Sequence, residues 1–117
     1  MKAGKILAFW IVGILLTGCA TQTMPGQTLG HPILQRDTWS LMQAIDSAED
    51  TKCKDRKVVN TEVTEKPRDV RFERERMLQG WWEERWTVDR CGKLVPYRVR
   101  YTADGKGGTY FTVGLER

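Results

Sequence analysis

The fold is decided by residues 81–113, WWEERWTVDRCGKLVPYRVRYTADGKGGTYFTV, in which apolar and polar side chains alternate. Successive side chains of a β-strand point to opposite faces, so this period of two predicts strands with one apolar face. The residues predicted to lie on that face are Trp82, Trp86, Val88, Val95, Tyr97, Val99, Tyr101, Phe111 and Val113. Two glycine-containing segments, 89–93 and 104–108, separate the strands and suit turns. The pattern predicts an antiparallel meander that buries one face.

A helix is predicted before these strands, capped by Asp37 or Thr38 and ending near residues 50–51. The apolar stripe predicted to pack on the sheet consists of Leu41, Ile45 and Ala48, flanked by Trp39 and Met42. The predicted fold class is therefore α+β, with one N-terminal helix packed on a small antiparallel β-meander of three to five strands.

The segment between helix and meander, residues 52–76, carries nine basic and six acidic residues. Residues 58–64 predict a strand, which Pro67 is expected to end, and Val70 to Phe72 predict the start of another. A run of mixed charge is typical of a solvated face.

The first nineteen residues have the features of a bacterial export signal. Lys2 and Lys5 precede an uncharged run of 11 residues from Ile6 to Leu16. As a helix this run spans about 16 Å, roughly half of a bilayer core, so it predicts a signal peptide and not a membrane span. It ends in Leu16-Thr17-Gly18-Cys19, which resembles the lipobox of bacterial lipoproteins. The alternative is an anchored or ordinarily cleaved signal followed by an incidental cysteine.

The resemblance implies that residues 1–18 are removed and that Cys19 carries a diacylglycerol on its thiol and an acyl chain on its new amine. Several acyl chains anchor a protein stably in a membrane, where one does not. Residue 20 is Ala and not the Asp that signals inner-membrane retention, so the resemblance implies an outer-membrane lipoprotein facing the periplasm. Residues 19–35 predict a flexible tether with His31 as a solvated side chain, followed by a domain over 36–117.

Charge and cysteine usage agree with that location. The net charge of the chain is +4, and loss of the signal leaves 17 basic against 15 acidic residues, which disfavours a nucleic-acid partner. In an oxidising compartment Cys53 and Cys91 predict a disulfide, which contributes roughly 4 kcal/mol in the chain-entropy model. The alternatives are two free thiols or a metal site. Two cysteines without a nearby histidine make a poor metal site, so no metal or cofactor is predicted.

Catalytic constellations are missing from the sequence, which predicts that the protein is not an enzyme. The single histidine lies in the predicted tether, residues 105–108 lack the spacing of a phosphate-binding loop, and the adjacent Glu83 and Glu84 point to opposite faces of a strand. Aromatic and basic residues instead predict a partner-binding patch, made of Trp81, Arg85, Arg98 and Arg100. The alternative is that Trp81 packs at an edge and the arginines only solubilise a strand.

Residues 81–113 also resemble small Gram-negative envelope lipoproteins, a resemblance that implies no activity. The expected function is that of a lipid-anchored lipoprotein that acts by binding, as an accessory or structural component of an envelope assembly. Its expected partners are the membrane, through Cys19, and another envelope protein. The alternatives are an inhibitor of a cell-wall hydrolase such as lysozyme, with residues 104–108 as its loop, and a carrier of lipid or another small ligand, which requires a cavity.

Overall fold

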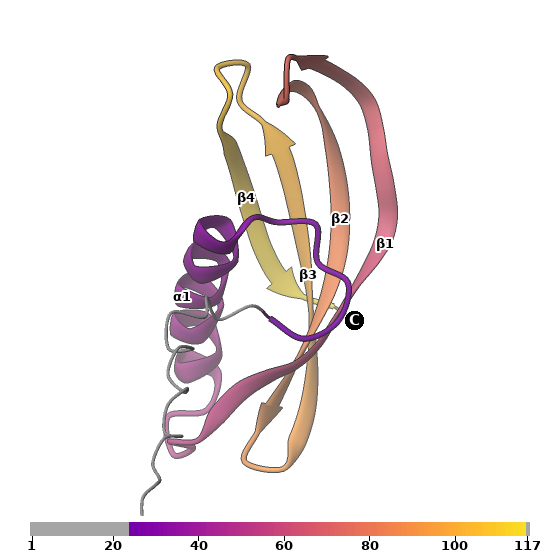
Figure 1. Ribbon diagram of the computed structural model, residues 1–117. Coiled ribbons are helices and arrows are strands. Elements are labelled where there is room, and N and C mark those ends of the chain that lie inside the picture. Colours follow the sequence, from indigo (N-terminus) through magenta and orange to yellow (C-terminus); the bar gives the residue numbers. More distant parts are fainter. Residues whose placement is uncertain (1–23, 117) are drawn as a thin grey trace, which may run out of the picture.

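The computed structural model describes residues 24–116, and within them the chain forms one helix and four strands (Figure 1). Their bounds are α1 Pro32–Glu49, β1 Arg56–Glu73, β2 Arg76–Arg90, β3 Lys93–Ala103 and β4 Thr109–Leu115. The strands form one antiparallel sheet in the order β1-β2-β3-β4, with α1 against one of its faces. The predicted α+β meander is confirmed. The predicted signal peptide, lipobox and Cys19 lie outside the described residues.

The two faces of the sheet follow the alternation in the sequence. We call the face toward α1 the inner face and the opposite one the outer face. Over residues 80–90 of β2 and 95–101 of β3 every second residue is buried on the inner face. The buried apolar core consists of Leu34, Met42, Trp82, Trp86, Val88, Val95, Tyr97, Val99 and Tyr101. The strand residues predicted to be buried are therefore buried, and Phe111 and Val113 of the edge strand are partly buried.

The helix begins earlier than predicted, at Pro32 and not at Asp37. His31 is its N-cap, and its Nδ1 accepts a hydrogen bond from the backbone N–H of Leu34 at 3.2 Å. A proline suits the first helical position because its φ is already helical and its missing N–H would have no partner there. The predicted tether over 19–35 is consequently wrong in its second half, because residues 32–35 are helical. His31 is exposed, but it caps a helix.

The segment before α1 lies against the sheet and is not a free tether. The Gln27 N–H donates to the Thr61 carbonyl of β1 at 2.8 Å, and the Thr61 hydroxyl donates to the Pro25 carbonyl at 2.7 Å. Gly26 is needed for this approach, because a Cβ there would lie 2.2 Å from the Thr61 carbonyl oxygen, and its φ is +96°. Residues 24–31 therefore cross from β1 to the start of α1 (Figure 1).

The predicted buried stripe of the helix is also wrong. Leu41 is 41% exposed and Ala48 is exposed, and only Ile45 of the three packs partly on the core. The face that is buried carries Leu34, Gln35, Thr38, Met42 and Asp46. Polar residues are tolerated there because the sheet supplies partners, as with the Thr38 and Tyr101 hydroxyls, which lie 2.8 Å apart.

Strand β1 is continuous through Pro67, where the sequence predicted a break between two strands. Its register with β2 shifts repeatedly between Val58 and Phe72. Proline is compatible with an edge strand or a bulge, since its missing N–H removes no bond from a central ladder. The predicted segments 58–64 and 70–72 thus belong to one irregular edge strand.

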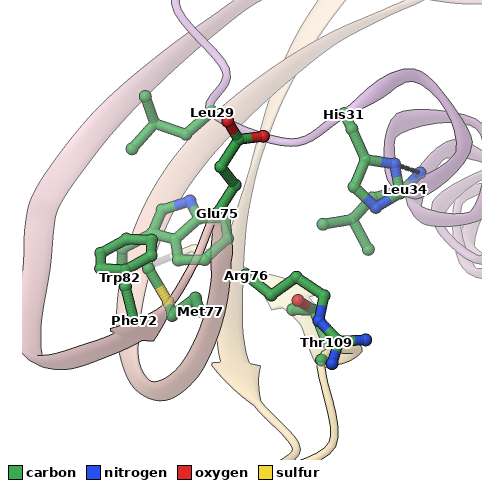
Figure 2. Close-up of a pocket in the computed structure, with 10 residues that line it drawn as sticks. Leu29, His31, Leu34, Phe72, Glu75, Arg76, Met77, Trp82 and Thr109 are labelled. Carbon is green, nitrogen blue, oxygen red and sulfur yellow. Dashed lines mark hydrogen bonds between the residues drawn. The ribbon is translucent and has the colours of Figure 1, made fainter.

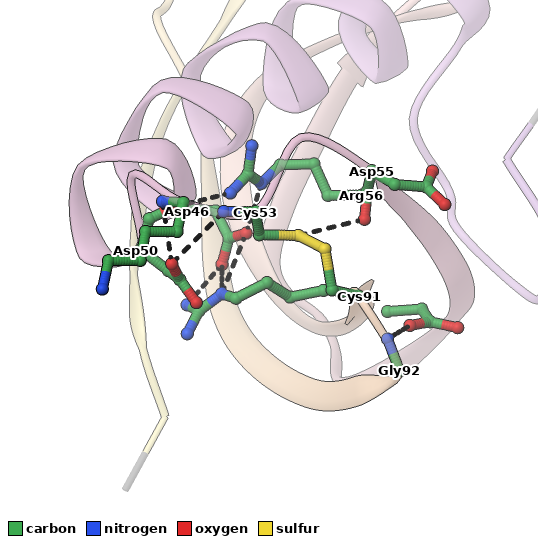
Figure 3. Close-up of a disulfide and its surroundings, with 10 residues drawn as sticks. Asp46, Asp50, Cys53, Asp55, Arg56, Cys91 and Gly92 are labelled. Carbon is green, nitrogen blue, oxygen red and sulfur yellow. Dashed lines mark hydrogen bonds and ion pairs between the residues drawn. A yellow bond between two sulfur atoms is a disulfide. The ribbon is translucent and has the colours of Figure 1, made fainter.

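The C-terminal end of α1 is held by a group that we call the Asp46 cluster: Asp46, Arg56, Arg90 and Tyr97. Figure 3 shows Asp46 and Arg56 of this cluster. The fully buried Asp46 carboxylate accepts from Arg56 Nε at 2.7 Å, from an Arg90 terminal nitrogen at 2.6 Å and from the Tyr97 hydroxyl at 2.5 Å. Burial acts to raise the pKa of Asp46, but the hydrogen bonds from its three partners outweigh burial and lower the pKa to about 2. One helical residue is thereby connected to β1, β2 and β3.

The predicted disulfide between Cys53 and Cys91 lies beside this cluster and is confirmed (Figure 3). Its Cα atoms are 6.0 Å apart across a sequence separation of 38. Cys53 belongs to the loop after α1, and Cys91 to the turn between β2 and β3. The Asp46 cluster and the disulfide together fix the same end of the helix to the sheet.

Candidate functional site

The four residues of the predicted partner-binding patch lie together on the outer face. Trp81 and Arg85 belong to β2, Arg98 and Arg100 to β3, and Arg85 is paired directly with Arg98 in the sheet register. Trp81 is half-buried, and its ring lies 3.9 Å from the Arg100 guanidinium carbon. The structure therefore brings these residues onto one surface.

Most of the charge in this patch is already paired within the chain. Arg85 donates to Glu116 at 2.6 Å and to Glu62 at 2.9 Å, and these hydrogen bonds raise the pKa of its guanidinium. Arg100 is 3.4 Å from a Glu83 carboxylate oxygen. Within residues 24–116, Arg98 is the member of the patch for which no ion pair within 4.0 Å is found.

A pocket that the sequence did not predict lies on the inner face, at the N-terminal end of α1 (Figure 2). Its volume is about 330 Å³. We call it the upper pocket, and its lining residues are Leu29, His31, Leu34, Phe72, Glu75, Arg76, Met77, Trp82, Gly107 and Thr109. An apolar wall of this kind, with polar groups at the rim, is typical of sites that bind ligands or partners.

The upper pocket exists because the strands are longer than the helix. The 18 residues of α1 extend roughly 27 Å, whereas the 18 residues of β1 extend roughly 60 Å. The β1–β2 and β3–β4 hairpins therefore extend past the start of α1, as Figure 1 shows. Arg76 lies between the two hairpins, where a Cβ on Gly107 would be 2.9 Å from its guanidinium nitrogen. Glycine at 107 leaves room for this side chain.

Two walls of the upper pocket are apolar and exposed. Phe72 is 56% exposed and Leu29 is 51% exposed. Leu29 also lines a second, shallower hollow of about 400 Å³ with Gln27, Val63, Lys66 and Pro67. Leu29 thus lies between the two depressions and lines both.

Leu29 is held in place by Glu84, a buried carboxylate that sequence reasoning missed as a site residue. Its Oε2 accepts from the Leu29 backbone N–H at 2.9 Å and from Trp82 Nε1 at 2.7 Å, and its Oε1 accepts from Trp86 Nε1 at 2.7 Å. The sequence does indicate this role, because the period of two places Glu84 on the inner face between Trp82 and Trp86. Tryptophan N–H groups need acceptors when buried, and one carboxylate supplies both.

We expect Glu84→Gln to loosen the wall of the upper pocket. Glutamine has the same shape but one acceptor oxygen fewer, so at least one of the three donors loses its partner, at a cost of about 1–3 kcal/mol. Whichever of the Leu29 amide and the Trp86 indole N–H then faces the new amide group should exchange with solvent at least about tenfold faster, measured by hydrogen–deuterium exchange. The control is Glu83→Gln on the outer face, which should leave both exchange rates unchanged; equal acceleration in both variants would contradict the assignment.

No protein-family model matches this chain, and no curated protein or solved structure shows significant similarity to it. Within the described residues, no three His, Cys, Asp or Glu side chains gather in a way that suits a metal ion. The helix that the structure describes is not long and apolar enough to cross a membrane.

Proposed function

We propose that the protein is a lipid-anchored lipoprotein of the cell envelope that works by binding, as an accessory or structural component of an envelope assembly. The upper pocket carries this proposal, because it combines an apolar wall with exposed Phe72 and Leu29. The anchor is proposed from Leu16-Thr17-Gly18-Cys19, with the outer membrane, facing the periplasm, as its location. The Cys53–Cys91 disulfide supports an oxidising compartment.

The occupant proposed for the upper pocket is an apolar side chain of a partner protein. The volume of about 330 Å³ lies at the lower end of the range for ligand sites, roughly 300–1,000 Å³. Protein interfaces concentrate their binding energy in a few apolar or aromatic anchors that enter such pockets. Glu75, Arg76, His31 and Thr109 at the rim offer hydrogen bonds and charge around the anchor.

A second candidate function is inhibition of a cell-wall hydrolase through the turn at residues 104–108. An inhibitory loop must be rigid, and Asp104 Oδ1 accepts from the backbone N–H of Lys106 at 2.7 Å and of Gly108 at 3.0 Å. These backbone N–H groups lower the pKa of Asp104. One carboxylate thus braces the turn at Lys106 and Gly108, which favours this candidate.

Site-specific photo-crosslinking in cells tests the proposal. A photoreactive phenylalanine at Phe72 lies in the upper pocket, and the same group at Leu94, which is 63% exposed, lies at the opposite end of the sheet. We expect one envelope protein to crosslink at Phe72 and not at Leu94, and the crosslink to disappear when Met77→Arg fills the pocket.

The alternatives give different results in the same experiment. Crosslinks to lipid at Phe72 would favour a carrier, and no crosslink at Phe72 would contradict binding at this pocket. A hydrolase crosslinked through Lys106 and inhibited by the purified chain would favour the inhibitor. Repeating the experiment with an exported form that begins after Cys19 tests the anchor, because the unlipidated chain should leave the membrane fraction and lose its partner.

A further inference from the structure

The two edges of the sheet differ in how they are protected. The β1 edge carries Pro67, repeated register shifts and many charges, all of which prevent another strand from pairing with it. The β4 edge, Thr109–Leu115, has no charged residue and no proline, and its register with β3 is unbroken. A regular, uncharged edge of this kind is suited to pairing with another strand.

The backbone of β4 has hydrogen-bonding groups that point away from the sheet. The Glu116 N–H donates to the Pro96 carbonyl at 3.1 Å, which sets the phase of the antiparallel ladder. By the alternation of that ladder, the N–H and C=O groups of Phe111, Val113 and Leu115 point to the free edge. Among the described residues none of these outward groups has a hydrogen-bond partner.

The helix lies near the free edge of the sheet. Of the four strands, α1 lies closest to β4, and in Figure 1 it runs along the side of β4 away from β3. Gln35, on one flank of α1, is hydrogen-bonded to Met24 and Gly30, in the segment that crosses β1. The other flank carries Leu41, which is 41% exposed, and Ile45, which is half-buried and packs partly on the core, so this flank lies on the β4 side of the helix.

A second copy of this chain does not fit as the occupant of the edge. Antiparallel pairing of two β4 strands places them about 4.8 Å apart and puts both helices on the same face. Each helix lies over its own β4, whereas packed helices need about 8–10 Å between their axes. The edge therefore suits an extended segment that brings no helix with it.

On the outer face, Arg98 favours a bound segment that carries a negative charge. Gly114 pairs with Arg98, and nothing lies within 4 Å of the place where a Cβ on Gly114 would be. The exposed Arg98 can thus extend across the bare glycine to the next strand position, about 10 Å away. An acidic side chain opposite Gly114 would pair with it.

We propose that the β4 edge binds an extended segment of a partner protein. The segment pairs with the backbone of Phe111 and Val113, packs apolar side chains under the Leu41–Ile45 stripe, and carries an acidic residue opposite Gly114 that contacts Arg98. This inference goes beyond the proposed function, since it rests on β4 and α1 and not on the upper pocket. The result of crosslinking at Phe72 therefore neither supports nor contradicts it.

The test uses the full chain and two capped peptides, Val-Glu-Val-Thr-Val-Thr-Val and the same sequence with Lys in place of Glu. In antiparallel register with Thr109–Leu115, the second peptide residue lies opposite Gly114. We expect the Glu peptide to slow amide exchange of Phe111 and Val113 at least about tenfold and to bind about fivefold more tightly than the Lys peptide. Arg98→Ala should remove that preference.

Two variants separate edge binding from folding. Val113→Pro removes an outward N–H and no bond of the β3–β4 ladder, so it should abolish peptide binding while circular dichroism stays native. Val113→Thr has a similar shape, retains the N–H and should still bind. The proposal is overturned if neither peptide slows exchange at Phe111 and Val113. It is also overturned if sedimentation shows a dimer that Val113→Pro dissociates, because the occupant would then be a second copy.

Discussion

Replacing Asp46 with asparagine is expected to lower the free energy of unfolding by about 3–5 kcal/mol, a large part of the total for a domain of this size. The variant keeps the shape of the side chain but removes its charge. Arg56 and Arg90, both almost fully buried, then lack their common counter-ion. Breaking a buried ion pair from one side is costly because the remaining charge stays out of water. Urea unfolding of the oxidised protein measures the loss.

The control is Glu49→Gln, three residues later on an exposed position of the same helix, which should change the free energy of unfolding by less than about 0.5 kcal/mol. Acid provides a second measurement. Because the folded pKa of Asp46 is about 2 against an ordinary value of 3.8, its ionisation contributes stability above pH 4 that disappears as the pH falls through 2. Wild type should lose about 2 kcal/mol over this range that Asp46→Asn does not. Parallel curves of unfolding free energy against pH for the two proteins would show that ionisation of Asp46 does not stabilise the fold.

The helix position depends on this cluster, and with it both proposed binding surfaces. Asp46 connects one end of α1 to three strands, and Thr38 contacts Tyr101 further along the same face. A helix that lost these contacts would be free to turn its more apolar stripe, Leu41 and Ile45, onto the sheet. The polar contacts instead keep Leu41 exposed and Ile45 only partly buried, beside the free edge of β4.

Contacts between residues far apart in the sequence also explain which parts of the fold the sequence predicts. The period of two in residues 81–113 is strong because side chains of β2 and β3 alternate between the core and solvent without interruption. The helical stripe was misassigned because hydrophobicity ranks Leu41 above Thr38 and Asp46, and only the partners on distant strands make those two suitable for burial. Pro67 was taken as a strand end because its position on an edge strand depends on the strand order, which no local pattern contains.

Of the two candidate sites, one was likewise predictable from the sequence and the other was not. The outer patch was predictable, since Trp81, Arg85, Arg98 and Arg100 follow from strand alternation, but its internal ion pairs depend on register with Glu62 and Glu116. The upper pocket was not predictable, because it results from the difference in length between helix and strands. It also needs residues 24–31 to cross the sheet, which the breakers Pro25 and Gly26 did not suggest.

Loss of the disulfide is the other large effect expected. Cys53→Ala with Cys91→Ala should lower the free energy of unfolding by roughly 4 kcal/mol, the chain-entropy value for a 38-residue separation. Cys91 has a φ of +48°, a left-handed conformation that costs a residue with a Cβ about 1 kcal/mol. Cys53→Ala with Cys91→Gly should therefore lose about 1 kcal/mol less, provided that the turn persists through the bond from the Gly92 N–H to Asp89 at 2.7 Å.

The disulfide and the Asp46 cluster fix the same end of α1, so their effects should not add. The Asp50 carboxylate accepts from the backbone N–H of Cys53 at 3.3 Å, and Arg56 donates to the Asp50 carbonyl at 3.0 Å, which joins the two features through one loop. A double-mutant cycle between Asp46→Asn and the paired cysteine variant should give a coupling energy of about 0.5–3 kcal/mol, as for groups in one network. If the two losses of unfolding free energy simply summed, the loop would not couple the disulfide to the Asp46 cluster. Each feature would then hold the helix independently.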